Sequence, residues 1–252
     1  MKFIRYKIKS GIRYGLVCDT HVLEIEGDIF SKYQVTETKH ALCDLKILSP
    51  CVPTKIIAIG LNYRSHAEEL GMALPEDPMV FMKPPTAVIG PDEEIIYPRM
   101  SSQVDYEGEL AVVIGKKCRF VTEEDSEKYI AGYTCFNDVT ARDLQKKDVQ
   151  FTRAKGFDTF APMGPFIETA INPCNVKIET FLNGEKKQSG NTNDLIFPVR
   201  TIVSFLSKIM TLCPGDIIAT GTPGGIGPMK RGDVVEVRIE GVGTLQNKVA
   251  DI

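Results

Sequence analysis

Three acidic residues alternate with apolar ones near the middle of the chain: Asp105, Glu107 and Glu109, which lead into an apolar run that ends at Gly115. Successive side chains of a β-strand point to opposite faces, so these carboxylates emerge on one side. On a buried face they repel one another unless they share a cation or retain a proton. A hard divalent ion such as Mg2+ or Mn2+, with a third protein ligand from elsewhere, suits such oxygens. The alternative is a half-exposed strand with its acids in solvent.

A second candidate site lies earlier in the chain, where His66 and Glu69 would share one face of a helix. Ser65 and Glu68 have the spacing of a capping box and Gly71 is a typical stop, so we expect a helix of one to two turns. An imidazole held by a carboxylate becomes a better base and can take a proton from water. The residues alone equally describe a surface helix that carries a histidine and acids.

The elements that must position these residues are mostly short strands. We expect strands at residues 2–9, 13–18, 21–25, 55–60, 104–115, 129–136, 176–182, 186–188, 217–220, 234–239 and 243–249. Two further helices are expected, at 122–129 with Thr122 as its cap, and at 199–210. Prolines at positions 50 and 53 favour an extended linker. They divide the chain into a small N-terminal β domain, residues 1–50, and a main domain, residues 51–252.

The composition is that of an ordinary soluble globular protein, with 43% hydrophobic and 25% charged residues and a formal net charge of −3. The charge gives no basic surface for binding nucleic acid. The sequence has no apolar stretch that approaches the length of a membrane span, and its first residues do not form a secretory signal. We therefore expect a cytoplasmic protein that binds neither nucleic acid nor membrane. The seven cysteines include no Cys-x-x-Cys pair, and we assign them no chemistry.

Several blocks of sequence resemble the fumarylacetoacetate hydrolase family, in the family's order, over about residues 52–249. The blocks are Gly60-Leu61-Asn62-Tyr63, Asp105-Tyr106-Glu107-Gly108-Glu109-Leu110, Asn137-Asp138-Val139-Thr140-Ala141-Arg142-Asp143, Arg153-Ala154-Lys155-Gly156-Phe157-Asp158, Pro214-Gly215-Asp216 and Gly221-Thr222-Pro223. The resemblance implies a mainly β fold with a few short helices, a mixed β-sandwich or β-roll core, and a homodimer. It also implies a site for Mg2+ or Mn2+, which Ca2+ could fill in a crystal, held by Glu107, Glu109 and Asp138. Asp105 matches no family ligand, which corrects the three-acid interpretation.

The resemblance also assigns roles to residues beside the metal site. It makes His66 and Glu69 a catalytic dyad. Lys155 matches a lysine that faces the substrate, where its charge can offset that of an enolate, and Gln145 matches a glutamine that precedes it.

A glycine-rich loop at residues 221–227 lacks the Gly-Lys-Ser/Thr of a phosphate-binding loop, so we expect no nucleotide. Its amides and the Thr222 hydroxyl suit a substrate carboxylate, although a turn without a ligand explains the glycines equally well. Arg64 and Lys83 are further candidates for binding a carboxylate.

Together these expectations describe a metal-dependent enzyme that cleaves a carbon–carbon bond in a small 2,4-dioxo acid, such as fumarylpyruvate or acetylpyruvate. The oxo acid would chelate the ion, the His66–Glu69 pair would deliver hydroxide to the distal carbonyl, and Lys155 would help to stabilise the pyruvate enolate. The resemblance leaves open a decarboxylase of oxo acids or an isomerase of hydroxymuconate-type dioates. The dyad favours hydrolysis, because enolate formation alone needs no activated water. From another class, a non-catalytic scaffold with a structural ion is the alternative.

Overall fold

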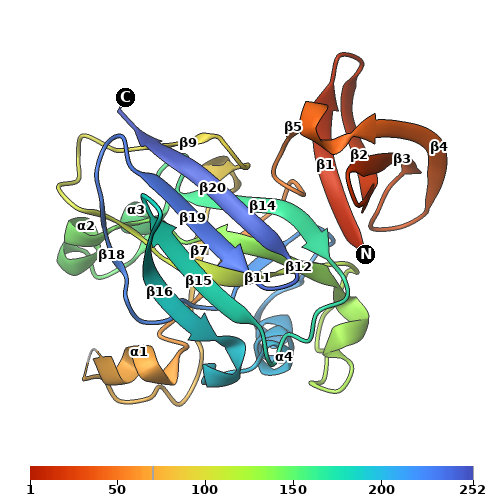
Figure 1. Ribbon diagram of the computed structural model, residues 1–252. Coiled ribbons are helices and arrows are strands. Elements are labelled where there is room, and N and C mark those ends of the chain that lie inside the picture. Colours follow the sequence, from red (N-terminus) through yellow and green to blue (C-terminus); the bar gives the residue numbers. More distant parts are fainter. Residues whose placement is uncertain (70, 252) are drawn as a thin grey trace.

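The computed structural model describes residues 1–69 and 71–251, and it shows two lobes built mostly of strands (Figure 1). Leu70, which falls within the expected His66 helix, and Ile252 lie outside the described residues. The helices among the described residues are short: α1 (Arg64–Glu69), α2 (Arg142–Lys147), α3 (Thr152–Lys155) and α4 (Val199–Ile209), with the 3-10 helices η1 (Leu42–Asp44), η2 (Pro85–Ala87), η3 (Ser126–Tyr129) and η4 (Thr192–Asp194). The expectation of a mainly β fold with a few short helices is confirmed. No helix in the described ranges is long and apolar enough to cross a membrane.

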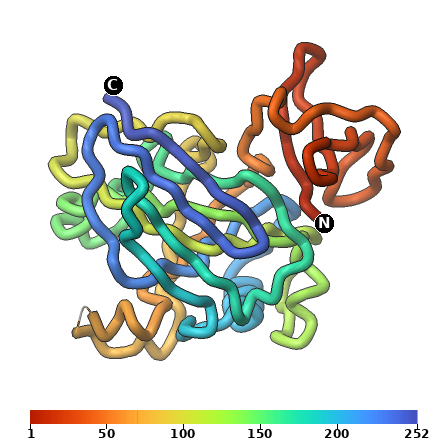
Figure 2. Tube along the Cα trace, viewed as in Figure 1, coloured from red at the N-terminus to blue at the C-terminus, as the bar shows by residue number. Residues whose placement is uncertain are grey.

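The small lobe is an antiparallel meander at the N-terminal end of the chain, drawn in red and orange in Figure 2. Its strands are β1 (Lys2–Ile8), β2 (Gly11–Cys18), β3 (His21–Gly27), β4 (Tyr33–Ala41) and the short β5 (Lys46–Ile47), which pairs with β1. The first residues of β1 also pair with β14 of the main lobe, so one continuous sheet runs through both lobes.

The main lobe is a sandwich in which a second sheet packs on the continuous one. Beyond β1, the continuous sheet has the order β14 (Ala161–Glu168), β12 (Ile130–Asn137), β11 (Gly108–Ile114), β17 (Ile217–Ala219), β6 (Ile56–Gly60) and β7 (Met79–Lys83), with β8 (Val88–Ile89) beside β14. The second sheet has the order β16 (Glu185–Asn191), β15 (Lys177–Leu182), β19 (Val234–Ile239), β20 (Gly243–Ala250) and β9 (Glu94–Ile96). A third, small sheet has the order β13 (Thr140–Ala141), β10 (Val104–Tyr106) and β18 (Gly227–Met229).

Strand β11 lies in the middle of the sandwich and is buried on both faces. Leu110 and Val112 pack in one hydrophobic cluster with α4 and the second sheet, and Ala111 and Val113 pack in another on the opposite face. A strand that is covered on both sides needs apolar residues at every position, which explains the unbroken apolar run in the sequence. The metal candidate at the start of β11 is therefore carried by a strand that is buried at every position.

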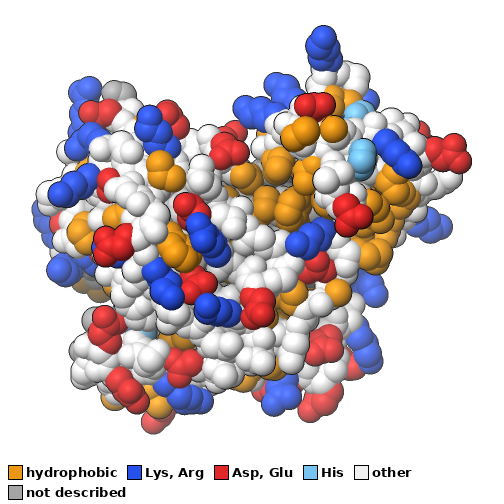
Figure 3. Space-filling view, viewed as in Figure 1, with side chains coloured by type: hydrophobic (Ala, Val, Ile, Leu, Met, Phe, Trp, Pro, Cys, Tyr) orange, Lys and Arg blue, Asp and Glu red, His pale blue; other side chains and the backbone are white. Residues whose placement is uncertain are grey.

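The surface agrees with the small net charge of the chain. On the face drawn in Figure 3, hydrophobic side chains gather on the small lobe, whereas charges of both signs are scattered over the main lobe. Ile12, Tyr33 and Val35 are exposed hydrophobic residues of the small lobe.

Three local expectations need correction. The expected strand 104–115 is broken at Glu107, and its halves β10 and β11 belong to different sheets. Ser65 does not begin a capping box, because it lies within α1 and binds Asp194, with its backbone N–H donating to Oδ2 at 3.1 Å. The expected helix 122–129 is reduced to η3.

Candidate active site

Three buried carboxylates meet at one end of β11 and β12. Glu107 lies between β10 and β11, Glu109 lies in β11, and Asp138 follows β12, where its backbone N–H donates to the Glu107 carbonyl at 2.8 Å. One carboxylate oxygen from each lies within 4.8 Å of those of the other two. Oxygens on opposite sides of a Mg2+ ion are about 4.2 Å apart, so small side-chain movements would bring all three onto one ion. An all-oxygen donor set fits a hard divalent cation, which makes a divalent metal site the natural interpretation.

Two lysines and an arginine surround this group. Lys155 Nζ donates to Glu107 Oε2 at 2.9 Å and to Asp138 Oδ2 at 2.5 Å. Lys83 Nζ donates to the other oxygen of Asp138, and Arg142 donates to the other oxygen of Glu107. Burial by itself would raise the pKa of Glu107, but Lys155 and Arg142 outweigh it and lower the pKa to about 2.

The opposing effects of burial and of nearby carboxylates shift the pKa values of the two lysines in opposite directions. Burial acts to lower the pKa of both, yet the carboxylates of Asp138 and Glu107 outweigh it at Lys155 and raise its pKa. At Lys83 burial prevails over Asp138 and lowers the pKa to about 8. Lys155 therefore remains a fixed positive charge beside the candidate metal site.

Glu109 differs from its two neighbours because no cation among the described residues forms an ion pair with it. Its side chain accepts a hydrogen bond from the backbone N–H of Gly221 at 2.8 Å. Burial, and then the charges of Asp138 and Glu107, raise its pKa well above the ordinary value. A divalent ion would supply the positive charge that this carboxylate lacks.

Asp105 is not part of the group. It accepts from Arg142 Nε at 2.8 Å and from Gln103 Nε2 at 3.0 Å. Arg142 also binds Gln145, so its guanidinium is held by three side chains. Arg142 was not among the candidate site residues from the sequence, although it lies in the Asn137–Asp143 block, four residues after Asp138.

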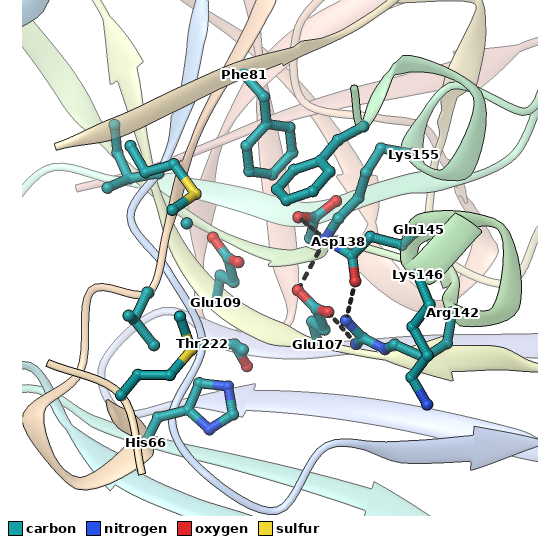
Figure 4. A pocket seen from close by; sticks show the side chains of 16 residues that line it. His66, Phe81, Glu107, Glu109, Asp138, Arg142, Gln145, Lys146, Lys155 and Thr222 are labelled. Atoms are coloured by element: carbon teal, nitrogen blue, oxygen red, sulfur yellow. Dashed lines mark hydrogen bonds and ion pairs between the residues drawn. The ribbon is translucent and has the colours of Figure 1, made fainter. Parts of the chain in front are cut away.

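A cavity of about 280 Å3 opens onto the carboxylates (Figure 4). Its polar lining includes the expected residues His66, Glu107, Glu109, Asp138, Gln145, Lys155 and Thr222, joined by Arg142 and Lys146. Its apolar lining is Ile59, Leu61, Met72, Met79, Phe81 and Phe151. The three carboxylates lie together in Figure 4, with Lys155 and Arg142 on one side and His66 across from Lys155.

The two residues expected to form a dyad lie together in α1. His66 Nδ1 lies 3.0 Å from Glu69 Oε2, and the same oxygen accepts from the backbone N–H of Gly225 at 3.3 Å. The imidazole is buried against the cavity, whereas 51% of the Glu69 side chain is exposed. A proton taken by the imidazole can therefore reach solvent through the outer carboxylate.

The other expected substrate-binding residues are placed differently. Arg64 is exposed and does not line the cavity, and Lys83 is buried behind Asp138. Thr222 does line the cavity, but its hydroxyl donates to the Gly108 carbonyl at 2.9 Å and accepts from Gln188 Nε2 at 2.8 Å. In this arrangement Thr222 offers a substrate a lone pair and not a donor.

Comparison with known proteins identifies the class. Residues 55–250 match the family described as "Fumarylacetoacetate (FAA) hydrolase C-terminal", and residues 1–50 match the family described as "Rv2993c-like, N-terminal". The chain belongs to the fumarylacetoacetate hydrolase family, as the sequence blocks indicated.

Relatives in this family carry names of different reaction types. The chain is 44% identical to oxaloacetate tautomerase YisK of Bacillus subtilis over 225 residues, which cover 83% of this chain and 75% of that protein. The structure of 2-hydroxyhepta-2,4-diene-1,7-dioate isomerase from Mycobacterium marinum aligns with a TM-score of 0.93 and 40% identity, and the alignment covers 100% of this chain and 98% of that one. A maleylpyruvate hydrolase from Sphingobium sp. SYK-6, solved with manganese(II) and pyruvate, aligns with a TM-score of 0.84 and 28% identity over 100% of this chain and 99% of that one. The family therefore includes tautomerase, isomerase and hydrolase members.

Proposed function

We propose that this protein is a divalent-metal-dependent hydrolase that cleaves a carbon–carbon bond in a small acylpyruvate or related 2,4-dioxo acid. The observation that carries the proposal is that the three carboxylates, His66 and Lys155 all line one cavity, while Glu69 holds His66 from outside it. The maleylpyruvate hydrolase solved with manganese(II) and pyruvate supports a divalent ion as cofactor and pyruvate as a product. Glu107, Glu109 and Asp138 would hold the ion, which supplies Lewis acidity and a binding point for the 2-oxo acid.

The His66–Glu69 pair provides the base in this proposal. When Nδ1 carries the proton of the neutral ring and donates a hydrogen bond to Glu69, the other ring nitrogen is unprotonated. That nitrogen can take a proton from a water molecule in the cavity. The hydroxide attacks the distal carbonyl, the bond between that carbonyl carbon and its neighbour breaks, and the electron pair passes into a pyruvate enolate. The imidazolium returns its proton to the enolate carbon, which leaves pyruvate and a carboxylic acid.

Two cations act on the charges of the reactants. The ammonium of Lys155 faces the cavity at a fixed position and stabilises the negative charge of the enolate. Arg142 is oriented by Asp105, Glu107 and Gln145, and it can direct its remaining N–H groups to the substrate carboxylate. In this proposal Arg142 takes the role for which Arg64 and Lys83 were candidates from the sequence.

A second candidate function uses the same residues without cleavage. Two relatives are named as a tautomerase and an isomerase, and both reactions move a proton through an enol or enolate. His66 and Glu69 can shuttle that proton as well as activate water. Decarboxylation of an oxo acid would share the enolate.

The test is a substrate panel with and without metal. Chelator-treated protein would be reloaded with Mg2+ or Mn2+ and given acetylpyruvate, fumarylpyruvate, oxaloacetate and a hydroxymuconate-type dioate. We expect metal-dependent release of pyruvate from an acylpyruvate, lost in His66→Ala. Interconversion of tautomers or isomers without pyruvate release would establish the second candidate. Full turnover in chelator would refute the metal-dependent mechanism.

A further inference from the structure

We propose that Gly224 is a positioning residue for the dyad: the absence of a side chain at this position allows the Glu69 carboxylate to rest on the Gly221–Gly225 loop and to orient His66. The expected effect on turnover rests on the proposed function, whereas the effect of Gly224 on the position of Glu69 does not. Its basis is that one loop contacts both Glu109 and Glu69.

The loop is held firmly by strand β16. Gln188 of β16 donates from Nε2 to the Pro223 carbonyl at 2.8 Å and to the Thr222 hydroxyl at 2.8 Å. Its Oε1 accepts from the backbone N–H of Gly108, the residue between Glu107 and Glu109, at 3.0 Å. A side chain on Gly190 would collide with Pro223, so β16 and the loop are in close contact. The loop is thus tied to the strand that carries the candidate metal ligands.

Glu69 depends on this loop for its position. It is the last residue of a six-residue helix, half of its side chain is exposed, and its hydrogen bonds among the described residues are those with His66 and the Gly225 amide. A Cβ atom on Gly224 would lie 2.6 Å from Glu69 Oε2, closer than any real contact. Any residue other than glycine at 224 would displace the carboxylate from the imidazole.

The geometry at Gly224 allows a substitution, Gly224→Ala, that should move Glu69 without disturbing the fold. The φ angle of Gly224 lies outside the left-handed region, so alanine is compatible with the backbone. The added methyl meets the outer end of a flexible, half-exposed side chain, which can swing into solvent. Gly225 offers no such test, because its φ is +90° and a Cβ there would lie 2.4 Å from the Lys187 carbonyl oxygen.

The experiment is a double-mutant cycle between Gly224→Ala and Glu69→Ala in the full-length, metal-loaded protein. We expect each single variant to lower kcat/KM by about 100-fold, the lower range for loss of a general base. The double variant should be no worse than Glu69→Ala alone, since the methyl then meets empty space. Losses that multiply would show that Gly224 acts by another route and would overturn the proposal.

A second readout does not depend on activity. The chain has three histidines, His21, His40 and His66, so the imidazole 15N signals of His66 can be assigned with a His66→Ala sample. Gly224→Ala should change these signals as Glu69→Ala does, and should leave Mn2+ affinity and the thermal midpoint near wild type. Unchanged His66 signals in Gly224→Ala would overturn the proposal. If Glu69→Ala retained full activity, the proposed base would be wrong, while the change in His66 signals would still support the role of Gly224.

Discussion

Glu109→Gln should stabilise the metal-free protein and weaken its metal binding at the same time. Glu109 is 2% exposed, lies beside two other carboxylates and receives one hydrogen bond from Gly221. Glutamine has nearly the same shape and can accept the same hydrogen bond, so the substitution removes little more than the ability to ionise.

The gain in the free energy of unfolding depends on the proton that Glu109 retains in the folded, metal-free protein. In the metal-free folded protein, burial and the neighbouring carboxylates raise its pKa well above the ordinary value of 4.5, to which it returns in the unfolded chain. Between these two pKa values the folded protein holds one more proton than the unfolded chain. Its free energy of unfolding therefore falls as pH rises, by up to about 1.4 kcal/mol per pH unit. The glutamine variant lacks this dependence, so the variant-minus-wild-type difference should grow with pH above about 5.

Urea unfolding of chelator-treated protein between pH 5 and 8 measures this difference. Glu68→Gln, which removes a carboxylate from an exposed position of α1, is the matched control. Adding Mn2+ at 100 times the wild-type Kd should stabilise the wild type by about 2.7 kcal/mol and the variant by much less. Parallel pH profiles for metal-free wild type and Glu109→Gln would refute the reasoning about this carboxylate.

Three other substitutions test separate parts of the site. Lys155→Met should lower kcat by about 100-fold or more, because it removes the cation beside the enolate, and the measurement is single-turnover release of pyruvate in saturating Mn2+. Arg142→Lys should raise KM for the oxo acid by about 10-fold with a smaller change in kcat, because an ammonium cannot bind Asp105 and Gln145 and still direct N–H groups to the substrate; equal KM values would contradict this role. Asp194→Ala removes the partner of Ser65, so hydrogen exchange should show faster opening of α1 with unchanged Mn2+ affinity.

Part of the local structure was predictable because its signals are local, although the long strands β4 and β14 were not among the expected strands. The strands expected at residues 176–182 and 186–188 are present as β15 and β16, which form a hairpin around Asn183-Gly184, and the apolar spacing of residues 199–210 produced α4. The expected helix at His66 is also present as α1. Its capping box failed because Asp194, 129 residues away in the sequence, binds Ser65, and a tertiary partner of this kind leaves no periodic signal.

By itself, the sequence determined the alternation of acids, the apolar run of β11 and the motif blocks that indicated the family, because each depends on residues close together in the chain. Only the tertiary structure decided that the strand breaks at Glu107, that Asp105 turns to Arg142 and that Lys83 lies behind Asp138. It also brought Gly224 against Glu69. These outcomes depend on contacts between elements that are distant in the sequence, and such contacts leave no local pattern in the chain.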